Sequence, residues 1–542
     1  MPTLDVSDLN IVVSVCGIFA VCYGLISVKL KSVWFLGEAL PAVFIGIVLG
    51  PIAANFLDAK RWGSATPDQQ DAITLGVMRV MIGIQLVIAG YQLPARYLQL
   101  RFKEMIVCLV PIMTLMWLAT SVCVLATIPK ISLLATLVIG ACVTSTDPIL
   151  SQAVAKGQFA DKYVARPLRE VISAEAGAND GFASPFLMLG VNLLRLTEHH
   201  QETLSKRNGR GVGDYTTDVG IALGNWAIET LLYIVVLAIA YGAVSGYCAR
   251  IAVKFSLSRR WVDSESYLLF PTALGLFIVG TCGALGTSDL LACFVAGCAL
   301  NWDGQFLAET ERRHDEVNSC IDVLLNFGGF MYIGTVLPWQ EFYQPDTTGI
   351  TYPRLIGLGL LVLFFRRIPA LLITYKMMPA VVKNWKEAVF MGYFGPIGVG
   401  AVYYLQHTRL LFPKGPEATK GERELLDALC PVVYFLVLFS IIVHGLSIPV
   451  LSTIYKFSGV KTITDDAVEI RRRSQYMAPP ANAFKGDSDT FIVYNRFFRP
   501  IAASLATLPI VRARSWDDNS SVSTEVEEKK RSQLVKFRQD QK

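Results

Sequence analysis

The chain has 542 residues, of which 53% are hydrophobic and 17% are charged. Soluble proteins carry about 25% charged residues, so this composition argues against a soluble globular protein. The formal net charge of +5 gives no reason to expect nucleic-acid binding. The eleven cysteines form no paired metal-binding motif, and no cofactor is expected.

Long apolar runs recur along the whole chain, each close to the ~20 residues that a membrane-spanning helix needs. They predict an all-α polytopic membrane protein with about thirteen transmembrane helices. The expected spans are residues 11–29, 33–50, 73–93, 104–128, 131–155, 167–195, 220–249, 266–284, 288–302, 320–338, 355–376, 386–407 and 430–454. The first span is expected to be retained, because the ten residues before it lack the basic region of a signal peptide.

The connections between these spans differ in charge, which predicts an orientation. Lysine and arginine are more frequent in the odd-numbered connections than in the even-numbered ones. Because basic residues favour the cytoplasmic side, the N-terminus is expected outside and the C-terminal tail in the cytoplasm. The transmembrane domain is expected at residues 1–455. Residues 456–542 are expected to form a largely disordered tail, because they are polar and charged.

Two predicted spans contain residues that interrupt a helix. The fifth span holds Thr-Ser-Thr-Asp-Pro at 144–148, and the twelfth holds Phe-Gly-Pro-Ile-Gly-Val-Gly at 394–400. Proline removes a backbone donor and clashes with the preceding turn, so both helices should open there. If the seventh span is a linker, the interrupted helices are fifth in each of two inverted six-helix repeats. Matched discontinuous helices that cross at mid-membrane are typical of a transporter ion site. Simple helix kinks are the alternative.

Carboxylates inside the spans are the first candidates for that site, since charges at membrane depth usually mark ion or proton pathways. Asp180 lies in the sixth span, and a short connection should bring it near Asp147 of the fifth. Burial raises the pKa of a carboxyl group and a nearby cation lowers it. One carboxyl group can therefore hold a proton or Na⁺ in turn. The alternatives are a helix–helix hydrogen bond for Asp180 and a helix cap for Asp147.

Other charged groups in the spans need partners. Arg366 or Arg367 of the eleventh span is expected to pair with Glu175 of the sixth, which gives Glu175 a structural role. Asp289 follows a serine at the start of the ninth span, where a helix cap is an equal alternative to a functional role. His407, at the end of the twelfth span, is a candidate pH sensor or simply marks the membrane interface.

These residues resemble the cation/proton antiporter superfamily and, within it, the fungal plasma-membrane Na⁺/H⁺ antiporters. The resemblance rests on Thr-Asp-Pro at 146–148, Glu-x-x-x-Asn-Asp at 175–180 and Phe-Gly-Pro-Ile-Gly-Val-Gly-Ala at 394–401. Ser-Asp-Leu-Leu at 288–291 is also similar to the family. Two positions depart from the family pattern: Ala176 follows the glutamate where serine is frequent, and Ser288 stands where fungal members often have aspartate.

The resemblance implies a fold, an activity and a set of site residues. The implied fold has thirteen helices in dimer and core domains, and the implied assembly is a homodimer with elevator-like alternating access. The implied cation and proton carrier is Asp180, with Asp147, Thr146 and Asn179 around it. Pro396, in the second interrupted helix, is an accessory site residue. The resemblance also implies exchange of Na⁺ for H⁺ across the plasma membrane, with Li⁺ and K⁺ as alternative cations. The implied role is in pH homeostasis and salt tolerance.

Three other functions are considered from the residues alone, of which a channel is disfavoured by the matched interrupted helices and the acid that can hold a proton. A K⁺/H⁺ exchanger of an internal membrane would use the same site. An intramembrane aspartyl protease would use two helix-borne aspartates, but the Gly-x-Gly-Asp context is absent and Pro148 would disturb the paired geometry. The expected protein is therefore a transporter in the lipid bilayer rather than an enzyme.

Overall fold

A computed structural model of the chain describes residues 7–497, apart from residues 33, 35, 63–64, 67, 207–219, 222, 314–316, 414, 466, 472–481 and 486–489. The chain divides into two compact units, Met1–Pro500 and Ile501–Lys542, and every described residue belongs to the first. The part of the predicted tail beyond residue 497 lies outside the described residues.

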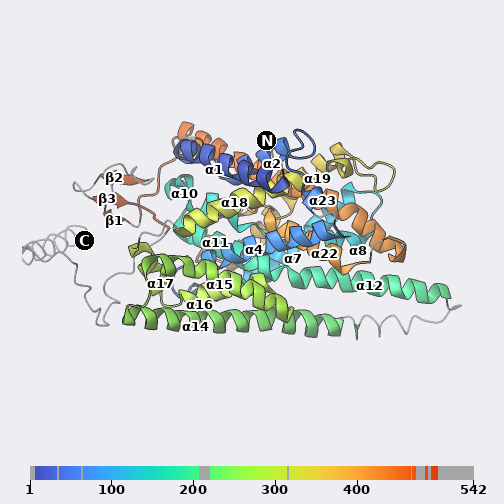
Figure 1. Ribbon diagram of the computed structural model, residues 1–542, viewed down its shortest axis with the longest axis horizontal. Coiled ribbons are helices and arrows are strands. Elements are labelled where there is room, and N and C mark those ends of the chain that lie inside the picture. Colours follow the sequence, from blue (N-terminus) through green and yellow to red (C-terminus); the bar gives the residue numbers. More distant parts are fainter. Residues whose placement is uncertain are drawn as a thin grey trace, which may run out of the picture. The chain divides into compact units, whose positions relative to one another are not determined.

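The described part is mostly helical (Figure 1). Its first helices are α1 (Asp8–Ser32), α2 (Ala39–Leu49), α3 (Ala59–Trp62), α4 (Gln69–Tyr91), α5 (Tyr97–Leu100), α6 (Phe102–Val107), the π-helix η1 (Cys108–Ile112) and α7 (Met113–Thr127). The next are α8 (Leu133–Cys142), α9 (Pro148–Lys156), α10 (Gln158–Tyr163), α11 (Arg166–Phe182) and α12 (Ser184–Lys206).

The middle of the chain continues with the π-helix η2 (Trp226–Val236), α14 (Leu237–Arg259), α15 (Ser264–Leu285), α16 (Asp289–Leu300), α17 (Gln305–Arg312), α18 (Val317–Val336) and the 3₁₀ turn η3 (Trp339–Phe342). The last helices are α19 (Tyr352–Phe365), α20 (Ile368–Thr374), η4 (Tyr375–Met377), α21 (Trp385–Tyr393), α22 (Val399–Leu411), η5 (Gly415–Glu417) and α23 (Lys420–Phe457).

Helix length and composition confirm the polytopic all-α class. Within the described ranges, eight helices are long and apolar enough to cross a membrane. A ninth is added if α16 and α17, which meet at a 79° bend, form one span. Helices α2 and α8 are apolar but shorter. The count of thirteen spans and the inverted repeats remain predictions.

Both expected helix interruptions are present. Helix α8 ends at Cys142 and α9 begins at Pro148, while α21 ends at Tyr393 and α22 begins at Val399. Proline is tolerated in the first turn of a helix, where its missing N–H would have no partner, so α9 starts at Pro148. The predicted span at 355–376 is also broken, between α19 and α20, where the chain turns at Arg366 and Arg367. The sequence did not predict this third break.

Helix α4 lies at the centre of the helical part. It packs against α11, α15, α16, α18 and α22 (Figure 1). Every residue from Met81 to Tyr91 is buried, so this half of the helix contacts protein on all sides. Glycines let its neighbours approach closely: a Cβ at Gly90 would fall within 3.0 Å of backbone atoms of α16, at Cys298 and Gly297. These contacts make α4 a rigid axis beside the interrupted helices.

Residues after α23 form a small antiparallel sheet of β1 (Val468–Arg471), β2 (Ala483–Lys485) and β3 (Thr490–Val493), in the order β1-β3-β2. Val468 and Ala483 both align with Val493 of the central strand. Asn495 follows β3 and donates its side-chain amide to the carbonyl of Val164 over 2.9 Å. No such strands are predicted from the sequence, because each has only three or four residues.

Candidate ion-binding site

Asp147 connects the two interrupted helices at the N-termini of their second halves, α9 and α22. Its Oδ1 accepts hydrogen bonds from the backbone N–H groups of Ile149 and Leu150 at 2.8 Å, which caps α9. Its Oδ2 accepts from the N–H of Val399, the first residue of α22, at 2.7 Å. The Asp147 N–H donates to the carbonyl of Pro396 over 2.8 Å. A negative charge here balances the positive ends of two helix dipoles. The helix cap considered for Asp147 is therefore present.

Arg366 occupies the complementary position, beside the carbonyl groups that precede the breaks. Its Nη2 donates to the carbonyls of Thr144 and Ser145 at 2.9 and 2.7 Å. Its Nη1 donates to the carbonyl of Gly395 at 2.8 Å. One guanidinium group thus satisfies carbonyls that both helices lose when they open. The third break in the chain, at 366–367, is what places this side chain at the crossing.

Asp180 is the other carboxylate at the crossing, and its surroundings differ. It lies on α11 and is 0% exposed. The Ser145 hydroxyl is the neighbouring donor that can reach its carboxylate, and Asp147 lies close enough to repel its charge. No backbone N–H of the described residues donates to either carboxylate oxygen. A buried carboxylate with so few donors is unfavourable in its charged form, so this group favours a bound proton or cation.

Two glycines of the second interrupted helix allow the carboxylates to reach it. A Cβ built on Gly398 would overlap the carboxylate of Asp147, and one built on Gly400 would overlap that of Asp180. Tyr404, one turn further along α22, donates its hydroxyl to the main-chain carbonyl of Asp180. Helix α22 thus holds both aspartates through its first two turns, and any larger residue at these glycines would displace them.

Thr146 and Asn179 form a closed pair beside Asp180. The Thr146 N–H donates to Asn179 Oδ1 over 3.1 Å, and Asn179 Nδ2 donates to Thr146 Oγ1 over 2.8 Å. Asn179 is 0% exposed and Thr146 is 1% exposed. Two hydrogen bonds between the same residues fix the opened chain of the fifth span against α11.

Glu175 pairs with Arg367 rather than with Arg366. Arg367 Nη2 lies 2.6 Å from Glu175 Oε2, and both side chains are at most 3% exposed. A buried ion pair of this kind leaves an uncompensated charge if either partner is removed. The two arginines are adjacent in sequence but have different partners. Arg367 neutralises Glu175, and Arg366 binds the carbonyl groups at the helix crossing.

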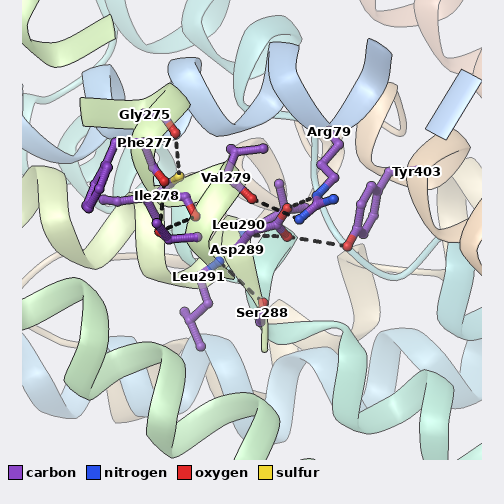
Figure 2. A network of polar contacts seen from close by, with 12 residues as sticks. Arg79, Gly275, Phe277, Ile278, Val279, Ser288, Asp289, Leu290, Leu291 and Tyr403 are labelled. Carbon is purple, nitrogen blue, oxygen red and sulfur yellow. Dashed lines mark hydrogen bonds and ion pairs between the residues drawn. The ribbon is translucent and has the colours of Figure 1, made fainter. Parts of the chain in front are cut away.

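Asp289 and His407 lie in a second polar network, in which Figure 2 shows Asp289 with Arg79 and Tyr403. Asp289, at the start of α16, forms an ion pair with Arg79 of α4 and lies 3.5 Å from the hydroxyl of Tyr403 on α22. Arg79 also donates to the carbonyl of Val279 over 2.9 Å. The His407 ring stacks on Tyr403, with centroids 6.1 Å apart. Ser288 rather than Asp289 caps α16, through the N–H of Leu291.

The structure thus brings most of the predicted site residues to one place. Asp180, Asp147, Thr146, Asn179 and Pro396 surround the helix crossing, and the Glu175 pair adjoins it. Asp289 and His407 lie in the neighbouring network, where each contacts Tyr403. The sequence reasoning gave no role to Arg79, Tyr403 or Tyr404 and did not single out the individual glycines. A charged residue inside a span could have indicated Arg79, whereas nothing in the sequence marks the tyrosines.

Comparison with known proteins decides the family. The family model described as "Sodium/hydrogen exchanger, transmembrane" matches residues 17–453, most of the chain. The chain belongs to the sodium/hydrogen exchanger family. The match covers both interrupted helices and every predicted site residue, so the site lies within the part that defines the family.

Curated fungal proteins are similar over most of the chain. Na⁺/H⁺ antiporter 2 of Zygosaccharomyces rouxii is 35% identical over 83% of this chain and 53% of its own length. The Na⁺/H⁺ antiporter of Saccharomyces cerevisiae is 34% identical over 83% of this chain and 44% of its own. The chain spans about half the length of these relatives. A Na⁺/H⁺ antiporter of Schizosaccharomyces pombe is 33% identical over 83% of this chain and 91% of its own length.

A solved structure shares the fold. The sodium proton antiporter MjNhaP1 of Methanocaldococcus jannaschii superposes with a TM-score of 0.52 at 14% identity. The superposition covers 81% of this chain and 100% of that one. The predicted resemblance to fungal cation/proton antiporters is therefore confirmed at the level of family and fold.

Proposed function

We propose that the protein is a secondary active transporter that exchanges Na⁺ for H⁺ by alternating access, with Asp180 as the carrier of both ions. The observation that carries this proposal is the buried carboxylate of Asp180, which accepts no backbone hydrogen bond from the described residues and has the Ser145 hydroxyl as a neighbouring donor. Such a group is stable only when it binds a proton or a cation. Because it cannot bind both, movement of the site between the two membrane sides couples the two flows.

The neighbours of Asp180 have supporting parts in this proposal. Asp147 keeps lone-pair capacity on Oδ2 beyond the hydrogen bond from Val399, so it can contribute to Na⁺ while it holds the two helices. Thr146 and Asn179 fix the opened chain and offer oxygen atoms beside the cation. Pro396 orients Asp147 through its carbonyl group. Oxygen ligands of this kind suit a hard alkali cation.

An intramembrane aspartyl protease fits the geometry poorly. Two aspartates that share a proton must face each other with free oxygens. Asp147 instead accepts three backbone hydrogen bonds and serves as a helix cap. The relatives above are named as antiporters, not as enzymes. A K⁺/H⁺ exchanger remains the second candidate, because the same oxygen atoms could accept K⁺.

We also propose the setting in which exchange takes place. The plasma membrane, a homodimer and an outside N-terminus with a cytoplasmic tail follow from the family resemblance and from the charge of the connections. The use of Li⁺ or K⁺ beside Na⁺ is part of the same proposal. Chemical cross-linking of the purified protein in lipid tests the dimer, and protease accessibility of the tail in sealed vesicles tests the orientation.

Proteoliposomes with a preset pH gradient test the function directly. The lumen is acidified, a pH-sensitive dye reports the gradient, and Na⁺, Li⁺ or K⁺ is added to parallel samples. We expect Na⁺ to dissipate the gradient, with choline as the inert control. Dissipation by K⁺ alone would establish the second candidate instead. Failure of all three alkali cations, with protein shown to be inserted and folded, would overturn the proposal.

A further inference from the structure

Two cavities lie at opposite ends of helix α4. The first, of about 530 Å³, is lined by Asp71 and Arg409 among others, and is called here the Arg409 cavity. The second, of about 620 Å³, is lined by Gln92 and Lys156 among others, and is called the Lys156 cavity. Asp71 lies in the first turn of the 23-residue α4 and Gln92 follows its last residue. They are therefore about 32 Å apart, close to the thickness of a bilayer core.

An ion pair lies in the wall of the Arg409 cavity. Arg409 lies in the last turn of α22, and its Nη1 is 2.9 Å from Asp71 Oδ1 on α4. The Asp71 side chain is 9% exposed and that of Arg409 is 30% exposed, so the contact is partly shielded from water. Both residues line the cavity, and the pair ties the outer end of α22 to one end of α4.

A matching contact crosses the Lys156 cavity. Lys156 is the last residue of α9, and its ammonium group donates to Oε1 of Gln92 at the other end of α4. Asp322 of α18 lines the same cavity and acts electrostatically on Lys156. Asp322 is itself held by Gln85 of α4, whose Nε2 lies 2.8 Å from its Oδ1. The far end of α9 is thus tied to the end of α4 opposite Asp71.

The two contacts are related through the interrupted helices. Helices α9 and α22 are the second halves of those helices, and the first turn of each donates a hydrogen bond to Asp147. From that point they run to opposite ends of α4. Each therefore carries one basic residue at its far end, placed to bridge one cavity. Asp180 is 0% exposed and lines neither cavity.

We propose that the Arg409–Asp71 pair and the Lys156–Gln92 contact are two latches that close the two access routes to Asp180, one on each side of the membrane. This inference rests on the proposed function. With both latches made, as here, the carrier is shielded from both sides. Release of one latch lets its half-helix move away from α4 and opens that side, so each half of the exchange cycle requires one release. Arg409 and Lys156 are positioning residues and do not bind the transported ion.

Matched substitutions Arg409→Met and Lys156→Met test the latches, because both remove the charge and keep a long side chain. The half-saturating Na⁺ concentration is measured separately from each side of oriented vesicles. Apparent affinity scales with the population of the state that is open to that side. We expect Arg409→Met to lower this concentration about threefold on the Arg409 side and raise it about threefold on the other. Lys156→Met should give the mirror image.

The sidedness separates this role from a merely structural one. A variant that only weakens the fold would change both sides in the same direction or lower the maximal rate alone, and either result would overturn the latches. The exchange of partners in Asp71→Arg/Arg409→Asp should restore the wild-type ratio between the sides, and Gln92→Leu should reproduce Lys156→Met. If wild-type vesicles show no exchange at all, it is the proposed function that fails.

Discussion

Asp147 and Asp180 are two carboxylates at the same helix crossing, and they differ in what holds them. Both are at most 1% exposed. Asp147 accepts three backbone hydrogen bonds, whereas the oxygens of Asp180 accept no backbone hydrogen bond from the described residues and have only the Ser145 hydroxyl nearby. The first carboxylate has already exchanged water for protein partners, and the second has not.

This difference shows how one site can keep a fixed geometry and still exchange the ion that it binds. Hydrogen bonds from three backbone N–H groups hold the carboxylate of Asp147 in one orientation, so Asp147 supplies a fixed geometry. A carboxylate without such bonds responds to whatever cation is present. The backbone N–H and C=O groups at the helix crossing therefore bind Asp147 and Arg366, and Asp180 stays available to bind a proton or cation.

The largest effect is expected for Asp180→Asn. Asparagine keeps the shape but cannot give up a proton or carry a charge, so Na⁺-dependent dissipation of a pH gradient should be lost entirely. The free energy of unfolding should stay unchanged or rise, because a neutral amide is less costly to bury than an unpartnered carboxylate. Thermal unfolding in detergent measures the second effect. Residual coupled Na⁺ flux in this variant would show that another group carries the ions.

Asp147→Asn should give the reverse balance between stability and transport. The amide nitrogen of asparagine cannot accept from a backbone N–H, so the bond from Val399 or the bonds that cap α9 are lost. An unsatisfied buried donor costs about 1–3 kcal/mol. We expect a clear fall in unfolding temperature and exchange reduced about tenfold but still measurable, since the carrier remains. Equal stability of the Asp147→Asn and Asp180→Asn proteins would remove the distinction between the two carboxylates.

Which features of the fold and the site could be predicted from the sequence depends on how far apart along the chain the interacting residues lie. The breaks at 144–148 and 394–400 follow from local chemistry, because proline and glycine act on the turn that contains them. The convergence of Asp147 and Asp180 follows from a short connection. The pairing of Glu175 was predicted with either Arg366 or Arg367, since two adjacent arginines look alike until the backbone between α19 and α20 sets their directions.

Contacts between residues far apart along the chain could not be predicted from the sequence. Tyr404 is 224 positions from Asp180 and carries no mark that distinguishes it from other tyrosines. The closeness of Gly400 to Asp180 likewise depends on how α11 and α22 pack. The sheet at 468–493 was not predicted because its strands have only three or four residues, too few for an alternating pattern to be recognised. Local patterns thus predict where a helix opens, and tertiary packing decides which side chains fill the opening.

Gly400→Ala should weaken transport while it leaves Asp147 in place. The added methyl group would overlap the Asp180 carboxylate, so either that side chain or the start of α22 must shift. Overpacking of this kind typically costs about 1–3 kcal/mol. We expect a several-fold loss of Na⁺ affinity in the proteoliposome assay. Gly357→Ala is the matched control, because a Cβ at Gly357 on α19 meets no atom within 4 Å. Similar effects of the two substitutions would rule out a specific contact with Asp180.

The smallest effect is expected for Thr146→Val, which keeps the shape of the side chain and removes its hydroxyl group. Asn179 Nδ2 then loses its acceptor, while the bond from the Thr146 backbone to Asn179 Oδ1 is kept. A net loss of about 1 kcal/mol in unfolding free energy follows from one hydrogen bond. If the hydroxyl oxygen also binds the cation, the half-saturating Na⁺ concentration should rise two- to fivefold, and Li⁺ and Na⁺ should change unequally. If it serves only the pair with Asn179, stability falls and the ratio between the two ions stays that of the wild type. Unfolding free energy and ion affinity, measured on this one variant, therefore show whether Thr146 binds the cation held by Asp180. If it does not, Thr146 only fixes the opened chain near Asp147.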